Sequence, residues 1–193
     1  MIEFALEQFP VRHSLANGVQ CLVRPLQKED ENAFMAFQQA VPTKERFLLK
    51  HRISDNVSFQ EWSQDLDFEK ALPLLSLADG KIVGYAMLHQ RPGGWKRHIG
   101  MVDALIHPDY RGLGVLRSLL GELVEVSKHC GLTKLEAEFN GERKNTITSF
   151  NRCGFAELLR LPDYLQDMEA HTHDYVLMGL DLSLDYEYAG AGD

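Results

Sequence analysis

Apolar and polar residues follow two different periods along the chain, the two-residue period of strands and the 3.6-residue period of helices. The apolar run Val19–Arg24 follows an Asn-Gly turn and ends at a proline, which predicts a strand. In residues 28–42, acidic residues precede apolar positions that share one face, and a closing proline completes the signature of a helix. A second, shorter helix is expected over residues 58–66, where Ser58 and Glu61 form a capping box.

The second half of the chain carries the clearest signals. Apolar runs on both sides of Asp79-Gly80 predict a hairpin over residues 73–90, because this dipeptide supplies the positive φ angles of a tight turn. The longest helical repeat covers residues 112–129, and Gly131 is placed to end it. Further strands are expected over residues 98–106, 133–140, 155–161 and 175–182, with a helix over 144–154 and a long connection over 162–174.

This order of elements predicts an α/β (α+β) fold built on a single mixed sheet of about six to seven strands flanked by helices. The length of 193 residues suits one domain, and no repeat, low-complexity linker or change of composition divides it. We therefore expect one domain over residues 1–193, with an ordered core from about residue 19 to 182 and a frayed tail over 183–193.

Composition limits the partners and the location. The net charge of −8 disfavours binding to nucleic acid and mildly favours cationic small molecules or basic peptides. Three cysteines without a CxxC pair indicate neither a disulfide framework nor a zinc site, which suits a reducing compartment. The first residues lack the features of a signal peptide, and no segment approaches the roughly 20 apolar residues of a membrane span. A cytoplasmic protein without a membrane partner is expected.

The stretch "IHPDYRGLGVLRSLL" carries the most informative chemistry. A strand end followed by Gly112, Gly114 and a helix directs free backbone N–H groups and the positive end of the helix dipole toward an anion. On this pattern alone, an ordinary helix start is an equally good interpretation. Two known phosphate loops are excluded, because no Lys-Ser or Lys-Thr follows the glycines and GxGxxG is absent.

The longer pattern "ALIHPDYRGLGVLRSLL", followed by a strand and then by "SFNRCGF", resembles the GNAT superfamily of N-acetyltransferases. The acetyl-CoA motif of that family is Gln or Arg, two residues, Gly, one residue, and Gly or Ala, and it maps to Arg111, Gly114 and Leu116. A later Tyr-x-x-x-Gly-Phe maps to Phe150 through Phe155, with phenylalanine in place of the tyrosine. The segments "FPVRHSLANGVQCLVRPLQKEDE" and "LPDYLQD…HDYVLM" also resemble the GNAT modules of bacterial protein-lysine acetyltransferases.

The resemblance implies how acetyl-CoA would bind. The backbone of Ala104, Leu105 and Ile106 would line the pantetheine arm and the acetyl group, with an N–H stabilising the thioester oxyanion. The pyrophosphate would be wrapped by Arg111, Gly112, Leu113, Gly114, Val115, Leu116 and Arg117. Asn145 and Phe150 would lie beside the cofactor, although Asn145 also suits an ordinary helix N-cap. No metal is implied.

The resemblance also implies that a carboxylate or a water chain removes a proton from the acceptor amine, since an ammonium group has no lone pair. The position that aligns with the acidic residue of many relatives holds Met101. Asp103, two residues on and on the same strand face, is the first candidate; a carboxylate paired with a nearby Arg or Lys is the alternative. Glu136 and Glu138 share one face of the next strand, and for at least one of them a solvated polar face is the alternative.

The leading function is therefore an acetyl-CoA-dependent N-acetyltransferase that acts on a primary amine of a small molecule, or on a protein lysine or N-terminus, by direct attack. The alternative is a non-catalytic acyl-CoA-binding sensor or interaction module, because Phe150 has no hydroxyl to protonate the thiolate; Tyr164 or a water would have to replace it. A phosphate-binding module ranks third. The histidines of "HTHD", residues 171–174, lack the further ligands of a metal site. The oligomeric state stays open, with a homodimer among the options.

Overall fold

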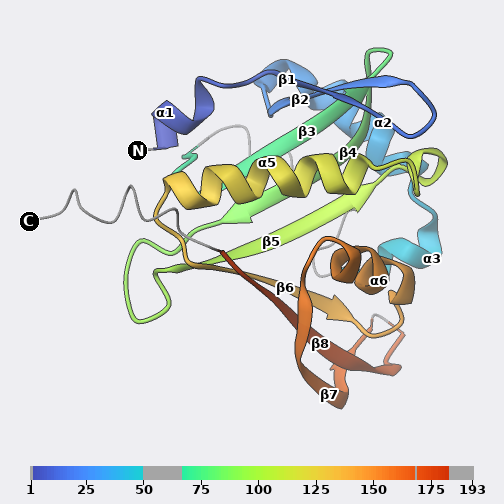
Figure 1. Ribbon diagram of the computed structural model, residues 1–193. Coiled ribbons are helices and arrows are strands. Elements are labelled where there is room, and N and C mark those ends of the chain that lie inside the picture. The colour runs from blue at the N-terminus through green and yellow to red at the C-terminus, as the bar shows by residue number, and fades with distance from the viewer. Residues whose placement is uncertain (1, 50–66, 168, 183–193) are drawn as a thin grey trace, which may run out of the picture.

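The computed structural model describes residues 2–49, 67–167 and 169–182 and shows one eight-stranded mixed sheet with helices on both faces (Figure 1). The strand order is β1-β2-β3-β4-β5-β6-β8-β7. The strands are β1 (Val11–Ser14), β2 (Gln20–Pro25), β3 (Ala71–Ala78), β4 (Lys81–His89), β5 (Ile99–Ile106), β6 (Lys134–Asn140), β7 (Ala156–Gln166) and β8 (Thr172–Asp181). The helices are α1 (Ile2–Leu6), α2 (Glu31–Ala40), α3 (Thr43–Arg46), α5 (Val115–His129) and α6 (Lys144–Arg152), with 3₁₀ turns at Lys28–Asp30 and Pro108–Tyr110.

The predicted class, a mixed α/β fold on a single sheet, is confirmed, but the expected count of six to seven strands was too low. The unexpected strand is β1, which pairs with β2 at the edge of the sheet. Its four residues, VRHS, are too few and too polar to produce a period-two signal. The short helices α1 and α3 were not expected either, since each has fewer residues than two helical turns.

The two faces of the sheet have separate apolar cores. Helix α5 packs across β3, β4 and β5 on one face and also contacts α1, while α2 packs on β4 from the other face. The α5 face holds most of the buried core, and the side chains that α5 contributes to it are Val115, Leu119, Leu120, Leu123 and Val126. The α2 face has a smaller core of Leu26, Phe34, Phe37, Val41, Leu75, Ile82 and Leu105. None of the described helices combines the length and the apolar character needed to cross a membrane.

Turn chemistry read from the sequence is confirmed at both predicted positions. Asp79 and Gly80 have φ angles of 49° and 73°, so the two central residues of the β3–β4 hairpin are both left-handed. Gly131, with φ of 74°, ends α5. The predicted helix over residues 58–66 and the predicted frayed tail over 183–193 lie outside the described residues.

The predicted connection over residues 162–174 is wrong, because β7 continues to Gln166 and β8 begins at Thr172. Nearly every side chain of β7 is exposed, so this strand has no apolar alternation by which to recognise it. Its pairing with β8 also shifts register between Leu161 and Leu165, around Asp163 with φ of 52°. A polar strand with a bulge therefore looked like a loop.

The junction between β5 and β6 places the candidate site. These strands form the parallel pair of the sheet, and their pairing covers Ile99↔Lys134, Gly100↔Leu135 and Met101↔Glu136. Beyond Met101 the two strands diverge, and Figure 1 shows β5 and β6 starting side by side and ending far apart. The edge of β5 that faces β6 thus has no strand partner from Val102 onward within the described sheet.

Candidate active site

A glycine loop at the end of β5 leads into the N-terminus of α5. Gly112 has φ of 76° and Gly114, the N-cap of α5, has φ of 100°, a region that L side chains rarely adopt. A Cβ added at either glycine would meet no atom within 4 Å, so these glycines leave open space in front of the helix. The helix itself begins at Val115, three residues later than the sequence predicted, because the two left-handed residues belong to the loop.

The backbone amides of residues 112–117, in the loop and the first turn of α5, have no hydrogen-bond acceptor among the described residues. The first intrahelical donor is Ser118, to the carbonyl of Gly114. The helix behind them has 15 residues, so its positive dipole end adds to the free donors. Such a cradle fits a pyrophosphate group.

The side chains of the loop are directed elsewhere. Val115 is buried, and Leu113 and Leu116 are partly buried against the core, while the carbonyl of Leu113 accepts a hydrogen bond from the amide of Ala16. Arg117 is exposed. These residues can therefore contribute to an anion site mainly through their backbone.

Arg111 connects the glycine loop to α3. Its guanidinium donates two hydrogen bonds to the Glu45 carboxylate, at 2.9 and 2.8 Å, and its Nε donates to the carbonyl of Ile106 at 3.3 Å. Glu45 was not considered in the sequence analysis, because nothing in the sequence places α3 near the end of β5. The guanidinium that was expected beside the pyrophosphate is thus bound to a carboxylate.

Three carboxylates lie on the α2 face of the sheet around the point where β5 and β6 separate. Met101 pairs with Glu136, so Asp103 and Glu138 each stand two residues further along their strands, on the same face and on opposite sides of the opening. Asp103 is 3.2 Å from Nε2 of His89. The sequence predicted that Glu136 and Glu138 share a face of their strand, whereas the register with β5 puts Asp103 on the same face, and the partners of the three carboxylates were not predicted.

The partners of the other two carboxylates come from a loop and from β8. Nζ of Lys96 lies 3.5 Å from Glu136, and the hydroxyl of Tyr175 donates to Glu138 at 3.0 Å. Burial and this hydrogen bond raise the pKa of Tyr175 to about 12. Tyr175 therefore stays protonated at neutral pH and donates to the carboxylate.

Two further polar groups lie close to the opening. Burial, together with the negative charge of Asp103, raises the pKa of Tyr85 above its ordinary value. Burial lowers the pKa of Arg143, against the opposing effect of Tyr85 and Asp103. The guanidinium of Arg143 lies over the ring of Phe139, 5.8 Å from its centroid. The opening thus contains charges of both signs.

The backbone of Ala104, Leu105 and Ile106 forms the last part of β5. These residues pair with β4 through Ala86↔Ala104, Tyr85↔Leu105 and Gly84↔Ile106. Their other edge faces the opening toward β6 and continues directly into the glycine loop. An extended ligand that starts at the α5 amides can therefore follow this strand edge toward the carboxylates.

Asn145 and Phe150, the two predicted cofactor contacts on α6, have different environments. Asn145 is exposed at the second position of α6; the N-cap is Arg143, so the alternative interpretation of Asn145 as the cap is wrong. Phe150 is 0% exposed, with ring centroids 4.8 Å from Phe139 and 5.1 Å from Phe155. Contact of either residue with a cofactor stays a prediction. Tyr164, the suggested replacement for the missing hydroxyl, is exposed on β7.

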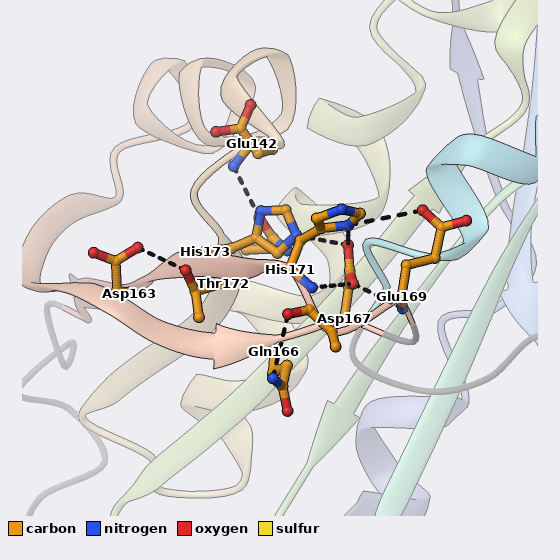
Figure 2. A network of polar contacts seen from close by, with 10 residues as sticks. Glu142, Asp163, Gln166, Asp167, Glu169, His171, Thr172 and His173 are labelled. Carbon is orange, nitrogen blue, oxygen red and sulfur yellow. Dashed lines mark hydrogen bonds and ion pairs between the residues drawn. The ribbon is translucent and has the colours of Figure 1, made fainter.

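The histidines of the "HTHD" stretch stabilise the β7–β8 turn (Figure 2). The Asp167 carboxylate accepts hydrogen bonds from the amides of His171 and Glu169, both at 2.9 Å, and from Nε2 of His173 at 2.9 Å. Nδ1 of His171 lies 3.4 Å from the same carboxylate. Within the described residues, no group of three or more His, Cys, Asp or Glu side chains could hold a metal ion.

Asp167 makes the stability of this turn depend on pH. The hydrogen bond from His173, followed by those from the backbone amides, lowers the pKa of Asp167 to about 2. A carboxyl group with a lowered folded-state pKa stabilises the fold above its ordinary pKa near 4 and loses this effect as the pH falls through the folded value. Asp167→Asn should therefore lower the melting temperature at neutral pH, and the difference from wild type should shrink between about pH 4 and pH 2.

Glu169→Gln is the matched control for this thermal denaturation series, because it keeps the backbone amide that donates to Asp167, and among the described residues the Glu169 carboxylate approaches only His171, at 3.7 Å. It should leave the melting temperature nearly unchanged across the series. A difference between Asp167→Asn and wild type that is equally large at pH 7 and pH 2 would contradict the assignment.

The residues that the sequence analysis missed around the site share one property. His89, Lys96, Tyr175, Arg143 and Glu45 reach it through strand register or through loops between distant segments. A period-two pattern assigns side chains to a face, but it does not say which residues lie opposite each other. His89 depends on the register of the consecutive strands β4 and β5, and Tyr175 depends on the register of β6 and β8, which are distant in sequence.

The chain belongs to an acyltransferase class, the Acetyltransferase (GNAT) family, whose sequence model matches residues 35–155. Over 94 residues the chain is 27% identical to the L-amino acid N-acyltransferase MnaT of Escherichia coli (strain K12). This match covers 46% of the chain and 52% of the relative, so the chain spans about half the length of that curated relative.

Solved structures show the same fold. The GNAT domain of S. lividans PAT superposes with a TM-score of 0.74 at 16% identity, covering 90% of this chain and 97% of that one. The structure of yncA, a putative acetyltransferase from Salmonella typhimurium with its cofactor acetyl-CoA, superposes with a TM-score of 0.70 at 20% identity, covering 84% and 94%. At these identities the likeness concerns the fold.

Proposed function

We propose that the chain is an acetyl-CoA-dependent N-acetyltransferase that transfers the acetyl group to a primary amine by direct attack. The observation that carries the proposal is the run of free amides at residues 112–117, which follows the end of β5, the strand whose pairing with β6 stops at Met101. Membership of the GNAT family and the acetyl-CoA held by a structural neighbour support it. We treat residues 1–193 as one such domain.

In this proposal the amides of Gly112 through Arg117 bind the pyrophosphate. The backbone edge of Ala104, Leu105 and Ile106 binds the pantetheine arm, and an N–H of this edge polarises the thioester carbonyl. Asn145 and Phe150 stay the proposed neighbours of the arm on α6. Arg111 reaches the pyrophosphate only when it leaves Glu45. Acetyl-CoA supplies an activated acyl group with a thiolate leaving group, and no metal takes part.

The acceptor is a primary amine, on a small molecule or on a protein lysine or N-terminus. One relative acts on L-amino acids, by its name, and a solved neighbour from Brucella melitensis is a ribosomal-protein-alanine N-acetyltransferase. The carboxylates Asp103, Glu136 and Glu138 would attract the cationic amine to the opening. Cytoplasmic location, a reducing environment for three free cysteines, and the absence of nucleic acid or membrane partners belong to the same proposal. The proposal also includes a homodimer as one option for the oligomeric state.

Departure of the thiolate, the step that follows attack of the amine, requires little assistance from the protein. The leaving group is a thiol, whose pKa is ordinarily about 8.5, so its thiolate departs far more readily than an alkoxide. A chain with phenylalanine at position 150 can therefore complete the transfer with water as the proton source.

The proposal is tested by incubating the protein with acetyl-CoA and a panel of amino acids, diamines, lysine peptides and peptides with a free N-terminus, while following the release of free thiol. Calorimetric titration with acetyl-CoA runs in parallel. Binding together with amine-dependent thiol release is the expected result. A protein that does not bind acetyl-CoA would contradict the proposal.

A non-catalytic acyl-CoA sensor is the second candidate, and two residues favour it. Phe150 is fully buried and has no hydroxyl, and Met101 stands where many relatives hold an acidic residue. The same experiment separates the two functions, because a sensor binds acetyl-CoA but releases no thiol with any amine of a broad panel.

A further inference from the structure

Asp103, Glu136 and Glu138 differ in the groups that they contact. Glu136 lies beside the ammonium of Lys96, and Glu138 accepts from the hydroxyl of Tyr175. Asp103 contacts an imidazole, 3.2 Å away at Nε2 of His89. Ammonium and phenol groups already carry their protons at neutral pH, whereas an imidazole as a residue type can take one up. Asp103 is thus the carboxylate with a proton-accepting partner.

The geometry of the β4–β5 pair brings these two side chains together. His89 stands directly opposite Met101, and Met87 stands opposite Asp103, so His89 and Asp103 are diagonal neighbours on the α2 face. Met101 is also the last β5 residue paired with β6. The contact therefore lies at the point where the opening between β5 and β6 begins.

We propose that His89 accepts the proton of the acceptor amine and that Asp103 is its positioning residue, an inference that rests on the proposed N-acetyltransferase function. An ionised carboxylate only accepts hydrogen bonds, so Nε2 of His89 donates its proton to Asp103. The lone pair of the neutral ring is then on Nδ1. Asp103 also stabilises the imidazolium that forms when Nδ1 is protonated.

The chemistry favours imidazole over a carboxylate as the base. A general base works best when its pKa lies near the operating pH, and a carboxyl group, ordinarily near 4, is a much weaker base than an imidazole, ordinarily near 6.5. If Asp103 were the base instead, a weaker base than imidazole would have to deprotonate the ammonium group. The same residue serves better as the fixed anion behind the imidazole.

Atoms and electrons balance in this step. The ammonium transfers one proton to Nδ1 of His89, directly or through a water, and its nitrogen lone pair forms the N–C bond with the thioester carbonyl carbon. The tetrahedral species collapses, the C–S bond breaks, and its electron pair leaves on the thiolate. The second nitrogen proton passes through water to the thiolate. The imidazolium then gives its proton to solvent, since the His89 side chain is 38% exposed.

Other charged groups in the described surroundings of His89 are few. β5 contributes Asp103, whose charge also acts on Arg143, β6 contributes Glu136 across Met101, and Lys96 pairs with Glu136. On its other side, β3 places the uncharged Ala71 opposite His89. The nearest identified partner of the imidazole is therefore the carboxylate assigned to position it.

The test measures steady-state thiol release for wild type, His89→Ala, and the double variant His89→Ala/Asp103→Asn, with and without added imidazole. His89→Ala should lower kcat about 100-fold, the scale of a lost general base, while the KM for acetyl-CoA stays nearly unchanged. Imidazole should restore part of the activity of His89→Ala but not of the double variant, because Asp103 positions the added ring. If the contact between His89 and Asp103 only stabilised the fold, the rescue by imidazole would not depend on Asp103.

His13→Ala is the matched control, since Nε2 of His13 makes a similar contact with Glu122, at 2.8 Å, on the β1 edge of the sheet. It should keep wild-type kcat. If His89→Ala does not fold, His89→Gln takes its place, and the expected loss of kcat is the same. A kcat within about threefold of wild type for the folded variant overturns the assignment, as does a loss of activity that appears only in Glu138→Gln. A wild-type protein that releases no thiol with any amine overturns the proposed function itself, and this assignment with it.

Discussion

Gly114→Val is expected to weaken acetyl-CoA binding about tenfold or more. At φ of 100° a β-branched residue is strained by roughly 1–2 kcal/mol, so the free loop should relax to another conformation that binding must reverse. A cost of about 1.4 kcal/mol corresponds to a factor of ten in affinity. The added side chain would also enter the open space in front of the amides of residues 112–117. Both effects act on the loop that is proposed to bind the pyrophosphate, so calorimetric titration should show the loss directly.

Gly131→Val is the matched control for this measurement. Gly131 also has a left-handed φ, 74°, with no atom within 4 Å of an added Cβ, but it lies beyond the opposite end of α5, a helix of 15 residues and thus about 22 Å long. This variant should lose stability and keep its affinity for acetyl-CoA. Equal affinities of the two variants would show that the N-terminal loop of α5 is not the phosphate site.

Phe150→Ala is expected to lower the free energy of unfolding by about 3–5 kcal/mol, the range found when a buried aromatic ring is removed from a core. Phe150 is 0% exposed and makes edge contacts with Phe139 of β6 and with Phe155 at the start of β7. Removal of the ring leaves a cavity where α6 packs on the sheet. Denaturant titration by circular dichroism measures the loss.

The control for this prediction is Phe4→Ala, because Phe4 on α1 is 68% exposed. Its effect should stay within about 0.5 kcal/mol, as for most surface substitutions. A similar small loss for Phe150→Ala would contradict its place in the core. If the folded Phe150→Ala variant also binds acetyl-CoA more weakly, the predicted contact of this residue with the cofactor gains support.

The fold could be predicted wherever one face of an element is buried. The hairpin around Asp79-Gly80 and the amphipathic helix α5 both show their core-facing residues in the sequence. β1 and the second half of β7, residues 162–166, did not, because an exposed edge strand has no apolar face to alternate with a polar one. The missing strand and the false loop have this common cause.

In the candidate site, too, some residues could be predicted from the sequence and others could not. The glycine loop and the carboxylates Asp103, Glu136 and Glu138 could be identified because local spacing determines them. The partners His89 and Tyr175 could not, since they depend on which residues of two strands stand opposite each other. Tyr175 lies on β8, which pairs with β6 although α6 and β7 separate the two strands in the chain, so local spacing does not encode this register.

The short junction between β5 and β6 divides the sheet into two units that are each contiguous in sequence. Residues 11–106 form one antiparallel unit, β1 to β5, and residues 134–181 form the other, β6 to β8. Each unit keeps its own hydrogen-bonded ladders whether or not the other moves. Any change in the angle between the two units would therefore have to be accommodated at the three residue pairs of Ile99–Met101.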